Sequence, residues 1–259
     1  MSYRQLDEAQ IIRTIERLTD RIGERFPEAG LRKVANELLG LARDTAACVD
    51  YLRRPNWPLR LGIGAAIVGI VGLLTTLALS VRVTPATAGG FTEIVQGIEA
   101  AVNDVIFVGI AIYFLLTIER RLKRRRALRT IHELRSVAHI VDMHQLTKDP
   151  ERLVSSQPDT PSSPARTMTV AELGRYLDYC SELLSVTSKI AALLVQHFDD
   201  AVVLAGVNEV EGLATGLSSK IWQKITILER VRGSPTPASA PAASLPSSVP
   251  QVAIDRGQP

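Results

Sequence analysis

The sequence predicts an all-α integral membrane protein with a two-span transmembrane helical hairpin and long cytoplasmic helical hairpins that form a coiled-coil-like bundle. Two long apolar segments lie close together in the chain, and charged segments with apolar residues at helical spacing flank them on both sides. The 259 residues are 46% hydrophobic and 22% charged. Charge and hydrophobicity are therefore segregated along the chain, which favours a membrane protein with folded parts outside the bilayer.

Residues 1–57 are predicted to form a cytoplasmic helical hairpin. Apolar residues recur every three or four positions in an otherwise charged stretch, at Ile11, Ile15, Leu18 and Ile22. Pro27 interrupts this pattern, which then resumes at Leu31, Val34, Leu38, Leu41, Thr45, Cys48 and Leu52. Two antiparallel helices are the expected result.

Residues 58–118 are predicted to form the transmembrane hairpin, with spans at about 60–81 and 100–118. Residues 61–81 carry no charge, and as a helix they would be about 31 Å long, which matches a hydrocarbon core of roughly 30 Å. The second span contains Asp104 as its only charged residue. Trp57 precedes the first span, where an interfacial aromatic anchor is expected.

The basic residues around the two spans predict their orientation. Arg53, Arg54 and Arg60 precede the first span, a dense basic run follows the second, and Arg82 is the only basic residue between them. Because cytoplasmic flanks retain Lys and Arg, both termini are expected in the cytoplasm, with the spans in the plasma or inner membrane.

The basic run "ERRLKRRRALR", residues 119–129, is predicted to bind the anionic headgroups of the inner leaflet. Its headgroup-binding candidates are Arg120, Arg121, Lys123, Arg124, Arg125, Arg126 and Arg129. A nucleic acid is the alternative partner. The net charge of +3 and the lack of aromatic residues among these charges argue against it.

Small residues repeat at helical spacing in the first span and predict a helix-packing face. This small-residue stripe consists of Gly62, Ala65, Gly69, Gly72 and Thr76, and the second span offers Ala101, Asp104 and Ala111 in a similar rhythm. Asp104 is open to two interpretations. In the first, it is a functional intramembrane acid that can form a hydrogen bond with Thr76. In the second, it lies at a shallow depth and reaches the outer headgroups.

Beyond the second span the helix is predicted to continue as a basic juxtamembrane helix, residues 119–149. The Pro- and Ser-rich residues 150–167 are expected to be a flexible linker. Thr169 and Glu172 have capping-box spacing at the start of a second cytoplasmic hairpin, residues 168–232, whose second helix is capped by Asp199 or Asp200. The Pro-, Ala- and Ser-rich residues 233–259 are expected to be disordered.

No catalytic, cofactor or metal site is predicted. The chain contains no nucleophile elbow, no HExxH motif and no paired-cysteine motif. His132, His139 and His144 are too far apart, or point in directions too different, to share one ion on a helix. Cys48 and Cys180 lie on apolar stripes and are expected to be buried.

These features predict a non-enzymatic membrane protein whose cytoplasmic helices are an interaction or scaffold module, with a second copy of the chain or a helical protein as partner. The alternative is an oligomeric pore, channel-like protein or transport accessory built around the small-residue stripe and Asp104.

Overall fold

The computed structural model describes residues 5–80, 91–150, 160–163 and 168–233. Its elements are all helices: α1 (Glu8–Arg25), α2 (Gly30–Arg53), α3 (Trp57–Ser80), α4 (Phe91–Leu146), α6 (Val170–Gln196) and α7 (Ala201–Gly233). No strand occurs in these described ranges. The predicted all-α class is therefore confirmed for this part of the chain.

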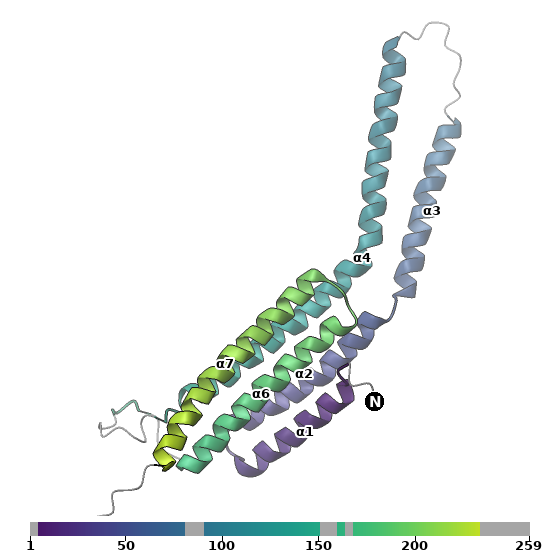
Figure 1. Cartoon of the computed structure of the whole chain (residues 1–259). Coiled ribbons are helices and arrows are strands. Elements are labelled where there is room, and N and C mark those ends of the chain that lie inside the picture. The colour runs from purple at the N-terminus through teal and green to yellow at the C-terminus, as the bar shows by residue number, and fades with distance from the viewer. Residues whose placement is uncertain (1–4, 81–90, 151–159, 164–167, 234–259) are drawn as a thin grey trace, which may run out of the picture.

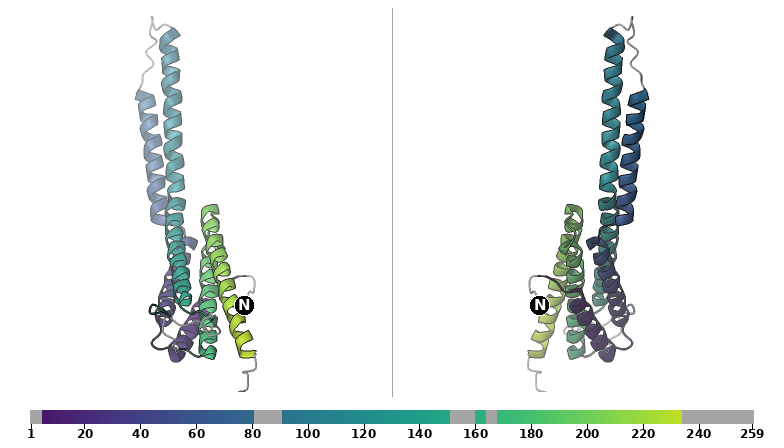
Figure 2. Two further views of the ribbon diagram at one scale, coloured as in Figure 1. Left: turned by 90° about the vertical axis from the view of Figure 1, so that its left-hand side faces the viewer. Right: turned by 90° about the vertical axis from the view of Figure 1, so that its right-hand side faces the viewer.

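The helices form a bundle with a long hairpin projecting from one end, as Figures 1 and 2 show. The hairpin consists of α3 and the first half of α4, and the second half of α4 continues into the bundle, where it packs against α2, α6 and α7. Helix α6 packs against α1, α2, α4 and α7 and so occupies the centre of the bundle.

The bundle core is built from the apolar stripes that the sequence displays. Ile15, Ile22 and Leu38 are fully buried at the α1–α2 contact, and α6 buries Leu177 and Leu184. Both cysteines are free and buried, which confirms their predicted place among the core residues. Burial of these side chains supplies the main driving force for assembling the bundle.

Helices α4 and α7 approach each other closely at Gly206. A Cβ atom at this position would lie 3.3 Å from the Cδ1 atom of Ile131. The missing side chain therefore lets the two helices pack at short distance, which keeps α7 against the bundle half of α4.

Polar side chains cap the starts of α6 and α7, as Asp7 caps the start of α1. Thr169 and Glu172 form the predicted capping box at the start of α6. Asp200 rather than Asp199 caps α7, because its carboxylate accepts hydrogen bonds from the amides of Val202 and Val203 at 3.1 and 3.3 Å.

Two helices of the structure are long and apolar enough to cross a membrane, and the apolar windows of both are unburied. Helix α4 begins at Phe91, earlier than the span predicted to start at residue 100. The residues of α4 before residue 100 include Glu93 and Glu99. Residues 81–90, with Arg82, and most of the predicted linker and tail, 151–159, 164–167 and 234–259, lie outside the described residues.

The two helices of the hairpin meet through aliphatic side chains. On α3 the half-buried residues recur at helical spacing at Ile63, Ile67, Ile70 and Leu74, and on α4 at Val108, Ile112 and Leu115. The described members of the small-residue stripe are exposed instead. The stripe therefore does not form the contact between α3 and α4.

Candidate functional site

The candidate site is the junction where α2 ends, α3 begins and α4 passes from the hairpin into the bundle. Pro55 lies between α2 and α3 and cannot donate the amide hydrogen bond that a continuous helix needs. The break leaves the last carbonyl groups of α2 and the first amide groups of α3 without partners in their own helices. Side chains of α4 supply those partners.

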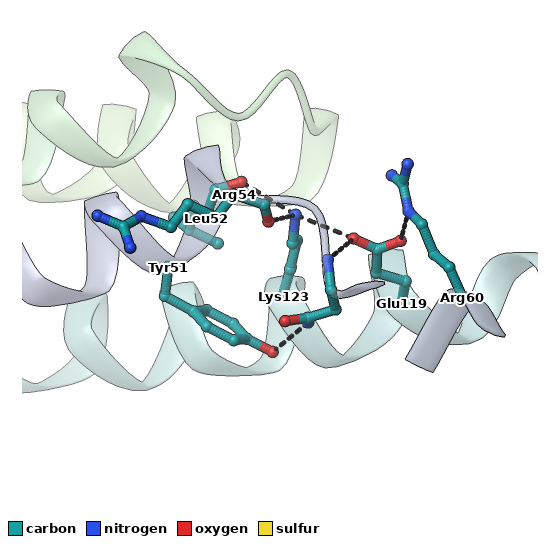
Figure 3. A network of polar contacts seen from close by, with 7 residues as sticks. Tyr51, Leu52, Arg54, Arg60, Glu119 and Lys123 are labelled. Atoms are coloured by element: carbon teal, nitrogen blue, oxygen red, sulfur yellow. Dashed lines mark hydrogen bonds and ion pairs between the residues drawn. The ribbon is translucent and has the colours of Figure 1, made fainter. Parts of the chain in front are cut away.

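Lys123 of α4 caps the end of α2. Its Nζ atom donates hydrogen bonds to the carbonyl oxygens of Leu52 at 3.1 Å and Arg54 at 2.8 Å. The residue is only 8% exposed, and Figure 3 shows its ammonium group directed at the chain that leaves α2. A cation at this position also interacts favourably with the negative end of the helix dipole.

Glu119, one turn before Lys123, binds the start of α3. Its Oε1 atom accepts the Asn56 amide at 3.2 Å, and its Oε2 atom accepts the Nε–H of Arg60 at 2.8 Å. The ammonium group of Lys123 lies 3.1 Å from the same carboxylate (Figure 3). The Asn56 side chain in turn donates to the Tyr51 hydroxyl at 2.9 Å.

These contacts determine the charge state of Glu119. Burial by itself raises the pKa of this carboxyl group, but the hydrogen bonds from Arg60, the Asn56 amide and Lys123 outweigh it and lower the pKa to about 2. Glu119 is therefore an anion at neutral pH, positioned between the two cations.

The next residues of the basic run bind the start of α7. The Nη2 atom of Arg124 lies 2.8 Å from the Oδ2 atom of Asp200, whose side chain is fully buried. Arg120 donates to the carbonyl oxygen of Asp199 at 2.6 Å. Burial opposes ionisation of Asp200, but Arg124 and the α7 amides lower its pKa. Two turns of α4 thus contact the ends of α2, α3 and α7.

The structure divides the predicted headgroup-binding residues into two groups. The inner basic residues, Arg120, Lys123 and Arg124, bind other helices of the same chain. The outer basic residues, Arg121, Arg125, Arg126 and Arg129, are exposed. The guanidinium of Arg121 lies 5.1 Å from the Phe114 ring centroid and that of Arg126 lies 4.8 Å from that of Tyr51.

Within the described residues, Arg125 and Arg129 make no hydrogen bond, ion pair or ring contact. The sequence prediction treated all seven charges alike. The buried contacts of Lys123 depart most from that uniform picture, because an 8% exposed side chain has little surface left to offer a headgroup.

The predicted helix-packing residues are not brought together within the chain. A Cβ atom added at Gly62, Gly69 or Gly72 would have no heavy atom within 4 Å. The Thr76 hydroxyl donates to the carbonyl oxygen of Leu73 at 2.8 Å. Asp104, Ala65 and Ala111 are exposed, and the side chain of Ala101 is outside the described set.

The histidines and acids of the described ranges form no group of three or more that could hold a metal ion. His144 lies beside Gly30, at a position where an added Cβ atom would clash with its ring. Burial, together with Lys148, lowers the pKa of His144. This histidine therefore takes part in packing at the end of the bundle far from the hairpin.

Sequence reasoning missed the junction, although a signal for it exists. Lys123 precedes Ala127, Ile131, Leu134 and Ala138 on the buried face of α4. A lysine that continues an apolar stripe is a candidate for an internal ion pair.

No protein-family model, no curated protein and no solved structure matches the chain.

Proposed function

We propose that the chain is a two-span membrane protein with both termini in the cytoplasm and that its bundle is a non-enzymatic interaction or scaffold module. The unburied apolar hairpin supports the two spans. The basic residues on the bundle side of both spans support the orientation.

The observation that carries the scaffold proposal is the junction. Glu119 and Lys123 bind α2 and α3 to the helix that also forms the second half of the hairpin. A bundle attached through one flexible linker would rotate freely below the membrane. Side chains of α4 bind the end of α2 and the starts of α3 and α7, and these contacts hold the surfaces of the bundle in one orientation relative to the hairpin. A binding surface at a membrane requires such a fixed orientation.

The outer basic residues are the part of the run proposed to contact lipid. They lie on the exposed surface of α4 directly after the apolar segment, at the depth where anionic headgroups would be found. Each such charge contributes about 1 kcal/mol of attraction to an anionic leaflet. Arg121, next to Phe114, marks the expected boundary between hydrocarbon and headgroups.

The small-residue stripe is proposed to serve self-association. Its glycines have open space around them within one chain, so a helix of a second copy can approach closely. The aliphatic face of α3 packs against α4, whereas the small-residue stripe lies on another face of α3 that remains exposed. The two faces can therefore serve different contacts.

Topology and assembly together test this proposal. Reporter fusions after residue 90 are expected outside the cell, and fusions after residues 50 and 235 in the cytoplasm. Light scattering of the purified protein in detergent is expected to give a mass of two or more chains. Opposite signals at the two termini, or a monomer at all protein concentrations, would contradict the proposal.

An oligomeric pore is the second candidate, and the exposed position of Asp104 favours it. An acid on the open surface of an apolar hairpin would be sheltered from lipid if several copies placed it around a common axis. Ion conductance in planar bilayers tests this alternative. Currents in the wild type that Asp104→Asn abolishes would support a pore over a scaffold.

A further inference from the structure

The first turn of α7 exposes apolar side chains on the surface of the bundle. Residues 201–207 contain no polar side chain. Val203 and Val207 are buried, whereas four residues of this segment, the apolar turn, are exposed: Ala201, Val202, Leu204 and Ala205. Val202 and Leu204 are each 46% exposed. A helix surface in contact with water normally carries polar side chains, so this turn departs from the usual pattern.

The apolar turn is confined to the end of α7 that lies nearest the hairpin. The next exposed positions are Asn208 and Glu209, and Glu209 forms an ion pair with Arg135 of α4. Single exposed apolar residues are common on protein surfaces, but a contiguous group of them indicates a binding surface.

Contacts with α4 place the apolar turn beside the junction. Arg120 donates to the carbonyl oxygen of Asp199 at 2.6 Å, and Arg124 lies 2.8 Å from the carboxylate of Asp200. Arg120 also directly precedes Arg121, the residue at the expected boundary between hydrocarbon and headgroups. Figures 1 and 2 show the start of α7 level with the start of α3, beside the hairpin.

We propose that the apolar turn enters the headgroup region of the membrane and attaches the bundle to it at a second point. This inference rests on the proposed insertion of the hairpin, because that insertion sets the level of the membrane surface. A helix segment with apolar side chains and neighbouring cations is the type of surface that lies in the boundary between headgroups and acyl chains.

The charges around the apolar turn fit a lipid partner. Arg120, with a side chain that is 61% exposed, brings a positive charge next to the exposed acid Asp199. The side chain of Asp200 is fully buried and paired with Arg124, so it presents no free negative charge to anionic headgroups.

A second attachment adds something that the hairpin alone does not supply. Transmembrane helices tilt in the bilayer, so a bundle fixed only to the hairpin tilts with it. The start of α7 stands to the side of the hairpin (Figure 2), and contact at this place would hold the bundle at one angle to the membrane plane.

Quenching of tryptophan fluorescence by brominated lipids tests the proposal in the full-length protein, reconstituted in bilayers. The protein has two tryptophans, so Trp57→Phe with Trp222→Phe gives a background without them. Leu204→Trp then places a reporter in the apolar turn. Thr215→Trp is the matched control on the same face of α7, about three turns and 16 Å further along the helix. Both positions are exposed, so the core is left intact.

Lipids brominated near the headgroup should quench Leu204→Trp roughly twofold more than Thr215→Trp, because only the first reporter lies at headgroup depth. Leu73→Trp, at an exposed position of α3, reports insertion of the hairpin through lipids brominated deep in their tails.

Equal quenching of Leu204→Trp and Thr215→Trp, with strong quenching of Leu73→Trp, would overturn this inference alone. Absence of quenching at Leu73→Trp would overturn the proposed insertion and this inference with it. A blue-shifted emission of Leu204→Trp that brominated lipid does not quench, and that grows with the ratio of protein to lipid, would also overturn it. A second copy of the chain would then cover the apolar turn.

Discussion

The Nζ atom of Lys123 lies 2.8 Å from the carbonyl oxygen of Arg54, so a side chain of α4 caps the C-terminal end of α2. Arg125, only two residues further along α4, is exposed and has no partner among the described residues. Neighbouring charges of one basic run thus have different surroundings. Lys123 belongs to the fold, whereas Arg125 remains available for a ligand.

Replacing Glu119 by Gln should weaken the junction. The amide cannot form ion pairs with Lys123 and Arg60, and the buried Lys123 would lose the one carboxylate that pairs with it among the described residues. We expect a loss of about 2 kcal/mol in the free energy of unfolding at pH 7, measured by chemical denaturation in detergent. Glu16→Gln, in a more exposed ion pair with Arg43, is the control and should cost less than about 1 kcal/mol.

The effect of Glu119→Gln should depend on pH in one direction. The pKa of Glu119 is lowered from 4.5 in the unfolded chain to about 2 in the fold. Its stabilisation is therefore complete above about pH 4.5 and is lost as the pH falls towards about 2. The stability difference between the wild type and the variant should be constant from pH 7 to pH 5 and shrink below that. A difference that grew on acidification would contradict the assigned charge state.

Asp200→Ala should loosen the start of α7. The substitution removes the cap for Val202 and Val203 and leaves Arg124 without its carboxylate. We expect a loss of about 2 to 3 kcal/mol in the free energy of unfolding. Faster hydrogen exchange should appear in the first turn of α7. Asp199→Ala, at an exposed neighbouring position, should leave both measurements nearly unchanged.

Gly69→Leu with Gly72→Leu should disrupt assembly between chains without opening the hairpin. Both added side chains have open space within one chain, but they would block the close approach of a second helix. Light scattering in detergent should show a lower mass, while a cysteine crosslink between α3 and α4 should form as in the wild type. Leu73→Ile is the control. If all variants had the same mass, the small-residue stripe would have no role in self-association.

Periodicity alone was sufficient to predict the helices of the bundle. Ile15, Leu38 and Leu184 lie on stripes that any core-facing helix in water must display, so burial could be inferred from spacing. The capping box at Thr169 was equally accessible, because it depends on residues three positions apart.

The contact face of the hairpin could not be predicted in the same way. Helix α3 is apolar on every side, so hydropathy does not distinguish Ile67 from Gly69, and only the structure shows which one faces α4. The junction was missed for another reason. Lys123 bonds to Leu52 and Arg54, far away in the chain, and within a run of similar charges only its place on the apolar stripe of α4 indicates that it points inward.

The most direct test of this account compares Lys123→Gln with Arg125→Gln, since both remove one positive charge from the same run. Lys123→Gln should lower the free energy of unfolding by about 1.5 to 3 kcal/mol and Arg125→Gln by less than about 0.5 kcal/mol. Association of anionic lipid with the full-length Arg125→Gln protein, purified in detergent, should weaken by about 1 kcal/mol in low salt.

In the full chain Lys123→Gln should change the association of anionic lipid less than Arg125→Gln does, because the ammonium group of Lys123 is buried. The decisive quantity is the loss of unfolding free energy in the full chain, measured for the two variants side by side. A loss confined to Lys123→Gln is the result that the junction predicts. Equal losses for the two variants would contradict it and would return the basic run to a uniform charged surface.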